Sequence, residues 1–225
     1  MKRNGADCAR MNTQTYRQQY RQQFVGPRYS GRAHLGFVLV FSLGGIALCL
    51  WQLDAVRPLE WLTVPAAFVY ANLAEYLGHR FVMHRLVPGL GLIYKRHAGQ
   101  HHVFFTRDHM ALDDWRDAKA VLFPPILMVF FFGVFATPVA LLLGVLFSAN
   151  IAWLFVATGL GYYLNYELLH LAYHLPEDSR WLRLPFLARL RRLHHVHHDT
   201  SLMASRNFNI TYPIGDWLFR TRASG

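Results

Sequence analysis

The sequence predicts an all-α integral membrane protein with four transmembrane helices and a cytoplasmic, histidine-rich helical cap. Three observations lead to this fold class: long stretches without charge, a one-sided distribution of basic residues, and a crowding of histidines. Hydrophobic residues make up 53% of the 225 residues and charged residues only 16%. The chain is therefore long enough for one domain and too apolar, in long runs, for an ordinary soluble core.

The uncharged stretches give the number of spans. Residues 33–53, 61–74 and 120–166 contain no Asp, Glu, Lys or Arg. A helix that crosses a bilayer needs about 20 mostly apolar residues. The first stretch predicts one span, and the second predicts another if its helix continues toward His79. The third would be about 70 Å long as one helix, so it predicts two spans with a turn between residues 137 and 149.

Basic residues then give the orientation. With four spans, both termini and the segment 79–119 lie on the same side of the membrane. Of the 23 Lys and Arg residues, all but Arg57 fall on that side. Lys and Arg concentrate in cytoplasmic segments, so both termini and the cap are expected in the cytoplasm. The formal charge of +10 is explained by this topology and by anionic lipids, and no nucleic-acid-binding motif is found.

Two regions are expected along the chain. Residues 1–32 form a basic polar leader with the repeat YRQQYRQQF, interpreted as flexible or interfacial, and residues 33–225 form the membrane domain. The leader is too polar for a signal peptide. Cys8 and Cys49 fall in the leader and in an apolar span, which predicts no disulfide and no CxxC site.

Histidines gather in four short stretches that follow the second and fourth predicted spans. The stretches are HRFVMH, HAGQHH, HLAYH and HHVHH, and they hold eleven of the 13 histidines. All four lie on the side that the basic residues define as cytoplasmic, although the two arguments use different residues. His34 and His109 stand apart and are predicted to have no metal-binding role.

Spacing within these stretches indicates a metal site. Residues three or four apart share one face of a helix, whereas residues five apart, such as His79 and His84, and adjacent residues diverge. Divergent neighbours suit two adjacent metal centres, and imidazole is a ligand for Fe, Zn, Cu and Ni. About ten imidazoles also exceed the four ligands of a zinc site. The pairs expected to share a face are His97 with His101, His170 with His174, and His194 with His197 and His198.

Two non-enzymatic interpretations remain open at this point. A metal transporter needs polar ligands along its spans, but the uncharged stretches carry only His34. A haem-binding membrane protein needs paired histidines on facing helices and no adjacent doublets. A zinc hydrolase of the usual kind is disfavoured because no HExxH motif is present.

The four stretches, in this order, resemble the fatty acid hydroxylase and sterol desaturase superfamily of integral-membrane di-iron enzymes. The likeness is greatest to fatty acid 2-hydroxylases and includes EYLGHRFVMH, GQHH, LFPP, GYYLNYELLH and DWLFRT, over roughly residues 70–222. Two departures are visible. HAGQHH has three residues between its first histidine and the pair, and HHVHH is shorter by one residue, which leaves His194 and His195 as alternative ligands; helical spacing favours His194.

The resemblance implies an O2-dependent di-iron monooxygenase that hydroxylates an acyl chain near its carboxyl end. Desaturation, or oxygenation of a carotenoid or sterol, is the alternative. Zinc is expected as a possible substitute for iron. No cytochrome b5 domain is evident, so a separate electron donor of the cytochrome b5 or ferredoxin type is expected. The implied ligands are His79, His84, His97, His101, His102, His170, His174, His194, His197 and His198.

Carboxylates near these histidines in the sequence are expected to support them. A histidine that binds a metal usually donates its second N–H group to a carboxylate or a carbonyl. The candidate acceptors are Glu75, Glu167, Asp199 and Asp216.

Overall fold

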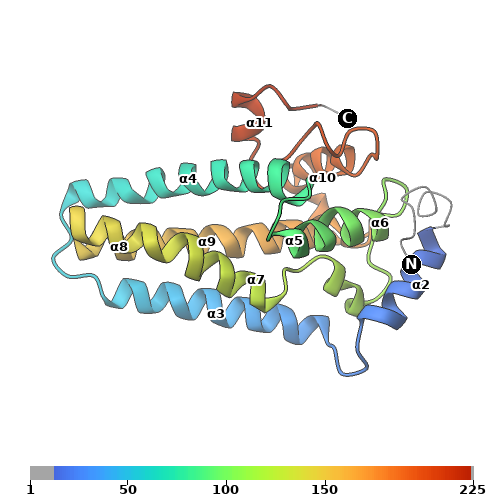
Figure 1. The fold of residues 1–225 in the computed structure, drawn as a ribbon, viewed down its shortest axis with the longest axis horizontal. Coiled ribbons are helices and arrows are strands. Elements are labelled where there is room, and N and C mark those ends of the chain that lie inside the picture. The colour runs from blue at the N-terminus through green and yellow to red at the C-terminus, as the bar shows by residue number, and fades with distance from the viewer. Residues whose placement is uncertain (1–12, 224–225) are drawn as a thin grey trace.

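The protein is a bundle of long helices with a cap of short helices and loops at one end, as a computed structural model that describes residues 13–223 shows (Figure 1). The long helices run side by side, and α9 contacts the other three. Within the described residues there is no strand, only a single bridge between Thr106 and His109, so the all-α prediction is confirmed. The long helices are α3 (Gly31–Trp51), α4 (Thr63–Gly78), α8 (Thr137–Leu146) and α9 (Ala149–Tyr173).

Shorter elements complete the bundle and form the cap. The 3-10 helix η1 (Pro58–Leu62) leads into α4, and α7 (Pro125–Phe130) continues through η5 (Phe131–Ala136) into α8. The cap elements are α2 (Thr13–Phe24), η2 (His79–Met83), α5 (Gly91–Arg96), η3 (His97–His101), α6 (His102–Phe104), η4 (Trp115–Ala120), η6 (Arg180–Arg183), α10 (Pro185–His197) and α11 (Ile214–Leu218).

Serine residues begin two of the long helices. The Ser30 hydroxyl accepts a hydrogen bond from the backbone N–H of Ala33 (3.2 Å), and Ser148 accepts one from Ile151 (3.2 Å). Such N-caps satisfy backbone donors that have no partner inside the helix. Because α8 ends at residue 146 and α9 begins at residue 149, the turn lies inside the predicted interval 137–149.

The outer surface of the bundle is apolar. Val40, Leu141 and Val145 are 75%, 66% and 84% exposed. Two segments of the described residues, Gly31–Trp51 and Trp115–Leu146, are long and apolar enough to cross a membrane, with mean hydropathies of 2.1 and 2.6. Large apolar surfaces of this kind fit contact with lipid. The four-span arrangement is not confirmed by this finding, because α4 and α9 are not among those segments.

Two of the cap segments are π-helices that begin at histidines. In η2 and η3 the backbone N–H of residue i+5 bonds to the carbonyl of residue i, as from His84 to His79 (3.3 Å) and from His102 to His97. π-helical turns are rare and occur mostly at functional sites. They place residues five apart in line, which the spacing of an ordinary α-helix does not do.

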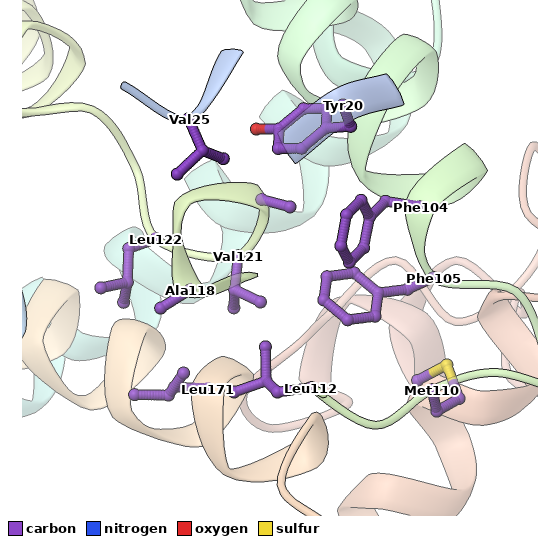
Figure 2. Packing of buried hydrophobic residues seen from close by; sticks show 11 residues of the cluster. Tyr20, Val25, Phe104, Phe105, Met110, Leu112, Ala118, Val121, Leu122 and Leu171 are labelled. Carbon is purple, nitrogen blue, oxygen red and sulfur yellow. The ribbon is translucent and has the colours of Figure 1, made fainter. Parts of the chain in front are cut away.

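The basic leader is structured over part of its length. Residues 13–24 form α2, which packs on the cap, with Arg17 and Tyr20 only 1% exposed. Tyr20 joins a buried cluster with Phe104 and Phe105 (Figure 2). Of the two interpretations of residues 1–32, a flexible leader is therefore wrong for residues 13–24. Residues 1–12 lie outside the described part of the chain.

Candidate metal centre

The ten predicted histidines meet in the cap as two adjacent clusters. In each group of histidines that could share an ion, the ligand nitrogens lie within 4.8 Å of one another. His198 joins the second group, because its Nε2 atom is 3.2 Å from that of His101 and 3.0 Å from that of His194. The first cluster is His79, His84, His97, His102 and His197, and the second cluster is His101, His170, His174, His194 and His198.

The π-helical turns build much of the first cluster. The Nε2 atoms of His79 and His84 are 3.1 Å apart, and those of His97 and His102 are 3.0 Å apart. The prediction that His79 and His84 diverge is therefore wrong, because it assumed α-helical spacing where the chain forms a π-turn. His97 and His101, which were predicted to share a face, do stack their rings (5.2 Å between centroids), but they belong to different clusters.

Adjacent histidines diverge, as predicted from their spacing. His101 and His102 belong to different clusters, and their rings are perpendicular. The end of α10 is divided in the same way. His194 and His198 are one helical turn apart and meet in the second cluster, whereas His197 turns toward His84 of the first cluster (Nε2 to Nε2, 3.0 Å).

Three further histidines lie outside both clusters. His195 is half-buried, and its Nε2 atom has no hydrogen-bond partner among the described residues. Of the alternatives His194 and His195, the structure brings only His194 to the cluster. His34 bonds to the Tyr29 hydroxyl and the Phe123 carbonyl, and His109 is exposed.

In five of the clustered histidines the Nδ1 atom is hydrogen-bonded to a backbone carbonyl and not to a carboxylate. In the first cluster, His79 Nδ1 bonds to the Phe208 carbonyl and His197 Nδ1 to the Arg206 carbonyl (2.8 Å). In the second cluster the bonds run from His101 to Ala120 (2.8 Å), from His174 to Met110 (2.7 Å) and from His198 to Phe105 (2.6 Å). Carbonyls within residues 105–120 thus accept hydrogen bonds from the second cluster, and carbonyls within residues 206–208 accept them from the first cluster.

The four predicted carboxylates bind groups other than the clustered histidines. None of them is hydrogen-bonded to a cluster histidine within residues 13–223, so that expectation is wrong. Asp216 accepts from the backbone N–H groups of Phe208 (2.9 Å) and Asn209 (2.8 Å), and Glu167 accepts from Phe123 (3.2 Å). The others bind a loop and a surface arginine: Glu75 accepts from the N–H of Thr211 (3.1 Å) and Asp199 accepts from Arg107 (2.8 Å).

The hydrogen bonds decide which nitrogen carries the proton. Burial lowers the pKa of His101 to about 3 and that of His197 to about 4, so both rings are neutral at pH 7. A carbonyl only accepts hydrogen bonds, so the Nδ1 atom of each ring must be the donor and the Nε2 atom must carry a lone pair. Unprotonated Nε2 atoms that converge in a buried space are what a metal ion requires of imidazole ligands.

An apolar cavity of 420 Å³ lies beside the clusters, between α4, η5 and α9. Ala67 and Phe155 line it deep in the bundle, and Met83 and Tyr166 line it near the cap. The Tyr166 ring also lies 5.7 Å from the ring of His170, centroid to centroid, so this lining residue stands between the cavity and the second cluster. Tyr166 was not among the predicted site residues, because it lies in an uncharged stretch with many other apolar residues; its position one helical turn before His170 is the signal that could have found it.

A helical bundle with two buried, all-imidazole clusters at one end defines a histidine-rich metal-binding protein associated with apolar helices. The particular family follows from a comparison of sequences. The model of the family described as fatty acid hydroxylase matches residues 64–221, and the chain belongs to that family of hydroxylases. The matched region includes all ten clustered histidines.

Among solved structures, the chain is similar to one titled as full-length Scs7p with only the hydroxylase domain visible. The identity is 18% and the TM-score is 0.62, over 97% of this chain and 83% of that chain. At this identity the likeness concerns the fold. No curated protein sequence matches the chain.

Proposed function

We propose that the protein is an O2-dependent lipid hydroxylase in which the two clusters each hold one iron ion. The observation that carries the proposal is the convergence of unprotonated Nε2 atoms, with the Nε2 atoms of His101 and His198 only 3.2 Å apart. Family membership supports hydroxylation as the reaction. Zinc is expected to occupy the same sites in overproduced protein, because imidazole accepts both ions.

The residues of the chain bind, orient and shield the substrate. Bound iron would supply the activation of O2 and the oxidation of an unactivated C–H bond. The apolar cavity binds an acyl chain with its tail toward Ala67 and its head toward Met83 and Tyr166. Since Tyr166 at the cap end of the cavity lies next to His170 of the second cluster, we expect the oxidised carbon to lie near the carboxyl end of the chain.

The proposed topology places four spans in the membrane. The α3 helix and the α7–α8 segment form two of them, and α4 and α9 form the other two. The cap and both termini would face the cytoplasm, where a separate electron donor of the cytochrome b5 or ferredoxin type would reach the clusters. The clustered histidines lie in the cap and at the cap ends of α4 and α9, and not along the length of the proposed spans, which favours an enzyme over a transporter.

Labelled O2 tests the reaction. Membranes that contain the protein are supplied with ¹⁸O2 and a reducing system, and the extracted lipids are analysed by mass spectrometry. We expect a hydroxylated acyl product with one ¹⁸O atom near its carboxyl end, and no product from the His101→Ala variant. An unsaturated product without a hydroxyl group would show a desaturase in place of a hydroxylase.

A further inference from the structure

The N-terminal helix α2 contacts the part of the chain whose backbone carbonyls bind histidines of the second cluster. Its fully buried Arg17 donates from Nη2 to the carbonyl of Ala111 (2.6 Å), in the segment that follows Met110. The Cζ atom of Arg17 also lies 4.6 Å from the centroid of the Phe104 ring. A buried arginine is rare unless it is paired, so this contact is a specific one.

Arginine–carboxylate pairs attach α2 to the same segment. Arg21 donates to both carboxylate oxygens of Asp117 (2.7 Å each) and to Asp113 (2.7 Å). Asp117 is fully buried and also accepts from the backbone N–H groups of Asp113 (3.0 Å) and Asp114 (3.2 Å). A bidentate arginine–carboxylate pair defines both distance and orientation, so α2 holds the residues 113–117 in one place.

A series of aromatic contacts connects α2 to a histidine of the cluster. Tyr20 of α2 contacts Phe104 edge to face (5.1 Å between ring centroids), and Phe104 contacts Phe105 in the same way (4.7 Å), an order that Figure 2 shows. The Phe105 ring in turn contacts His174 (4.1 Å). The residues that α2 contacts, 111–117, lie between two of the carbonyls that bind this cluster. The carbonyl of Met110 binds His174, and that of Ala120 binds His101. The carbonyl of Phe105 binds His198.

We propose that α2 is a positioning element for the second metal centre, acting through Arg17, Tyr20 and Arg21. In the first cluster the carbonyl partners of His79 and His197 come from residues 206–208, so the contacts of Arg17 and Arg21 with residues 111–117 do not include them. Tyr20 also accepts a hydrogen bond from Arg96, next to His97 (2.9 Å), so the two arginines carry the selectivity for the second cluster. The proposal rests on the proposed function in that it needs a metal ion in each cluster. It assigns to a segment at the start of the chain a role in only one of two adjacent centres.

Zinc binding to the full-length protein tests the proposal without any need for turnover. The number and affinity of bound zinc ions are measured by competition with a chelator for the wild type and for Arg21→Ala, with the exposed α2 residue Gln18 changed to Ala as the matched control. We expect Arg21→Ala to weaken one of the two ions about 10- to 100-fold, the usual effect of losing support behind a ligand. Gln18→Ala should match the wild type.

Double variants assign the weakened ion to a cluster. In a His84→Ala background, which damages the first cluster, Arg21→Ala should weaken the remaining zinc ion. In a His101→Ala background it should leave the remaining ion unchanged. An equal effect in both backgrounds would show a general loss of stability, and no effect in either would show that α2 does not position the centre; both outcomes overturn the proposal.

A milder variant covers the case in which Arg21→Ala does not fold. The Asp113 side chain is 48% exposed and contacts both Arg17 and Arg21. Asp113→Asn therefore weakens the ion pairs that attach α2 to residues 113–117. We expect the same cluster-selective effect, only smaller. A wild-type chain that binds fewer than two zinc ions would instead contradict the proposed function itself.

Discussion

The Nε2 atoms of His101 and His198 lie 3.2 Å apart, although both rings already donate their Nδ1–H groups to backbone carbonyls. Neither Nε2 atom then has a proton to share, so the two lone pairs face each other. Such a contact between neutral rings is unfavourable unless a cation lies beside it. The two residues are 97 positions apart in the sequence, and the fold of the cap brings them together.

Loss of a cluster histidine should remove metal and activity together. We expect His101→Ala to abolish hydroxylation and to lower the metal content of the purified protein, because His101 lies among the ligand atoms of the second cluster. His109→Ala is the control, since His109 is exposed and lies outside both clusters. Metal content and product formation are measured on the same samples. Equal metal loss in the two variants would contradict the ligand assignment.

The helical elements were predictable from composition, and the detailed pairing of the histidines was not. Uncharged runs give α3 and the turn at residues 147–148, because apolar length alone decides them. The π-turns at His79 and His97 have no comparable signal, so α-helical spacing paired the wrong residues. The divergence of adjacent histidines survives this error, since neighbours point apart in either kind of helix.

The long-range contacts that support the site also could not be predicted from the sequence. Backbone carbonyls hold five of the histidines, and a carbonyl is present at every residue, so no residue type marks those positions. The contact of Arg21 with Asp117 joins residues 96 positions apart. A basic repeat in a polar segment gives no sign that it will pair with a buried carboxylate.

Asp216 should matter to the first cluster only. It holds the backbone N–H groups of Phe208 and Asn209, and the Phe208 carbonyl holds His79. An amide at this position accepts one of these hydrogen bonds and opposes the other. We therefore expect Asp216→Asn to weaken one zinc ion about 10- to 100-fold.

The control for this change is Asp178→Asn, at an exposed position of the cap. Combination with His101→Ala should deepen the loss of zinc, whereas combination with His84→Ala should not. The opposite pattern would place Asp216 behind the second cluster.

The depth of the cavity should limit the length of the acyl chain. Ala67 is buried at the deep end, about 18 Å from His79 along α4. We expect Ala67→Leu to shift the hydroxylated products toward shorter acyl chains, because the added side chain occupies the space of the tail. The neighbouring Ala66 is exposed, so Ala66→Leu is the matched control. An unchanged product distribution, measured by mass spectrometry of lipids, would mean that the chain lies elsewhere.

Thiol labelling from outside intact cells should distinguish the two ends of the bundle. In a background without Cys8 and Cys49, we expect an impermeant reagent to label Arg57→Cys and not Ser205→Cys. Arg57 precedes η1 at the end of the bundle away from the cap, and Ser205 is an exposed residue of the cap. Lysed cells provide the control, since both positions should then react. Labelling of Ser205→Cys in intact cells would contradict a cytoplasmic cap.

Anomalous X-ray scattering at the iron edge, from crystals of protein purified with iron, tests the central claim most directly. The account predicts two peaks in the cap, one among the Nε2 atoms of the first cluster and one among those of the second cluster. In the His101→Ala protein the second peak should weaken and the first should remain. A single peak in the wild type, or a peak beside His109 or His195, would contradict a pair of centres built from these ten histidines.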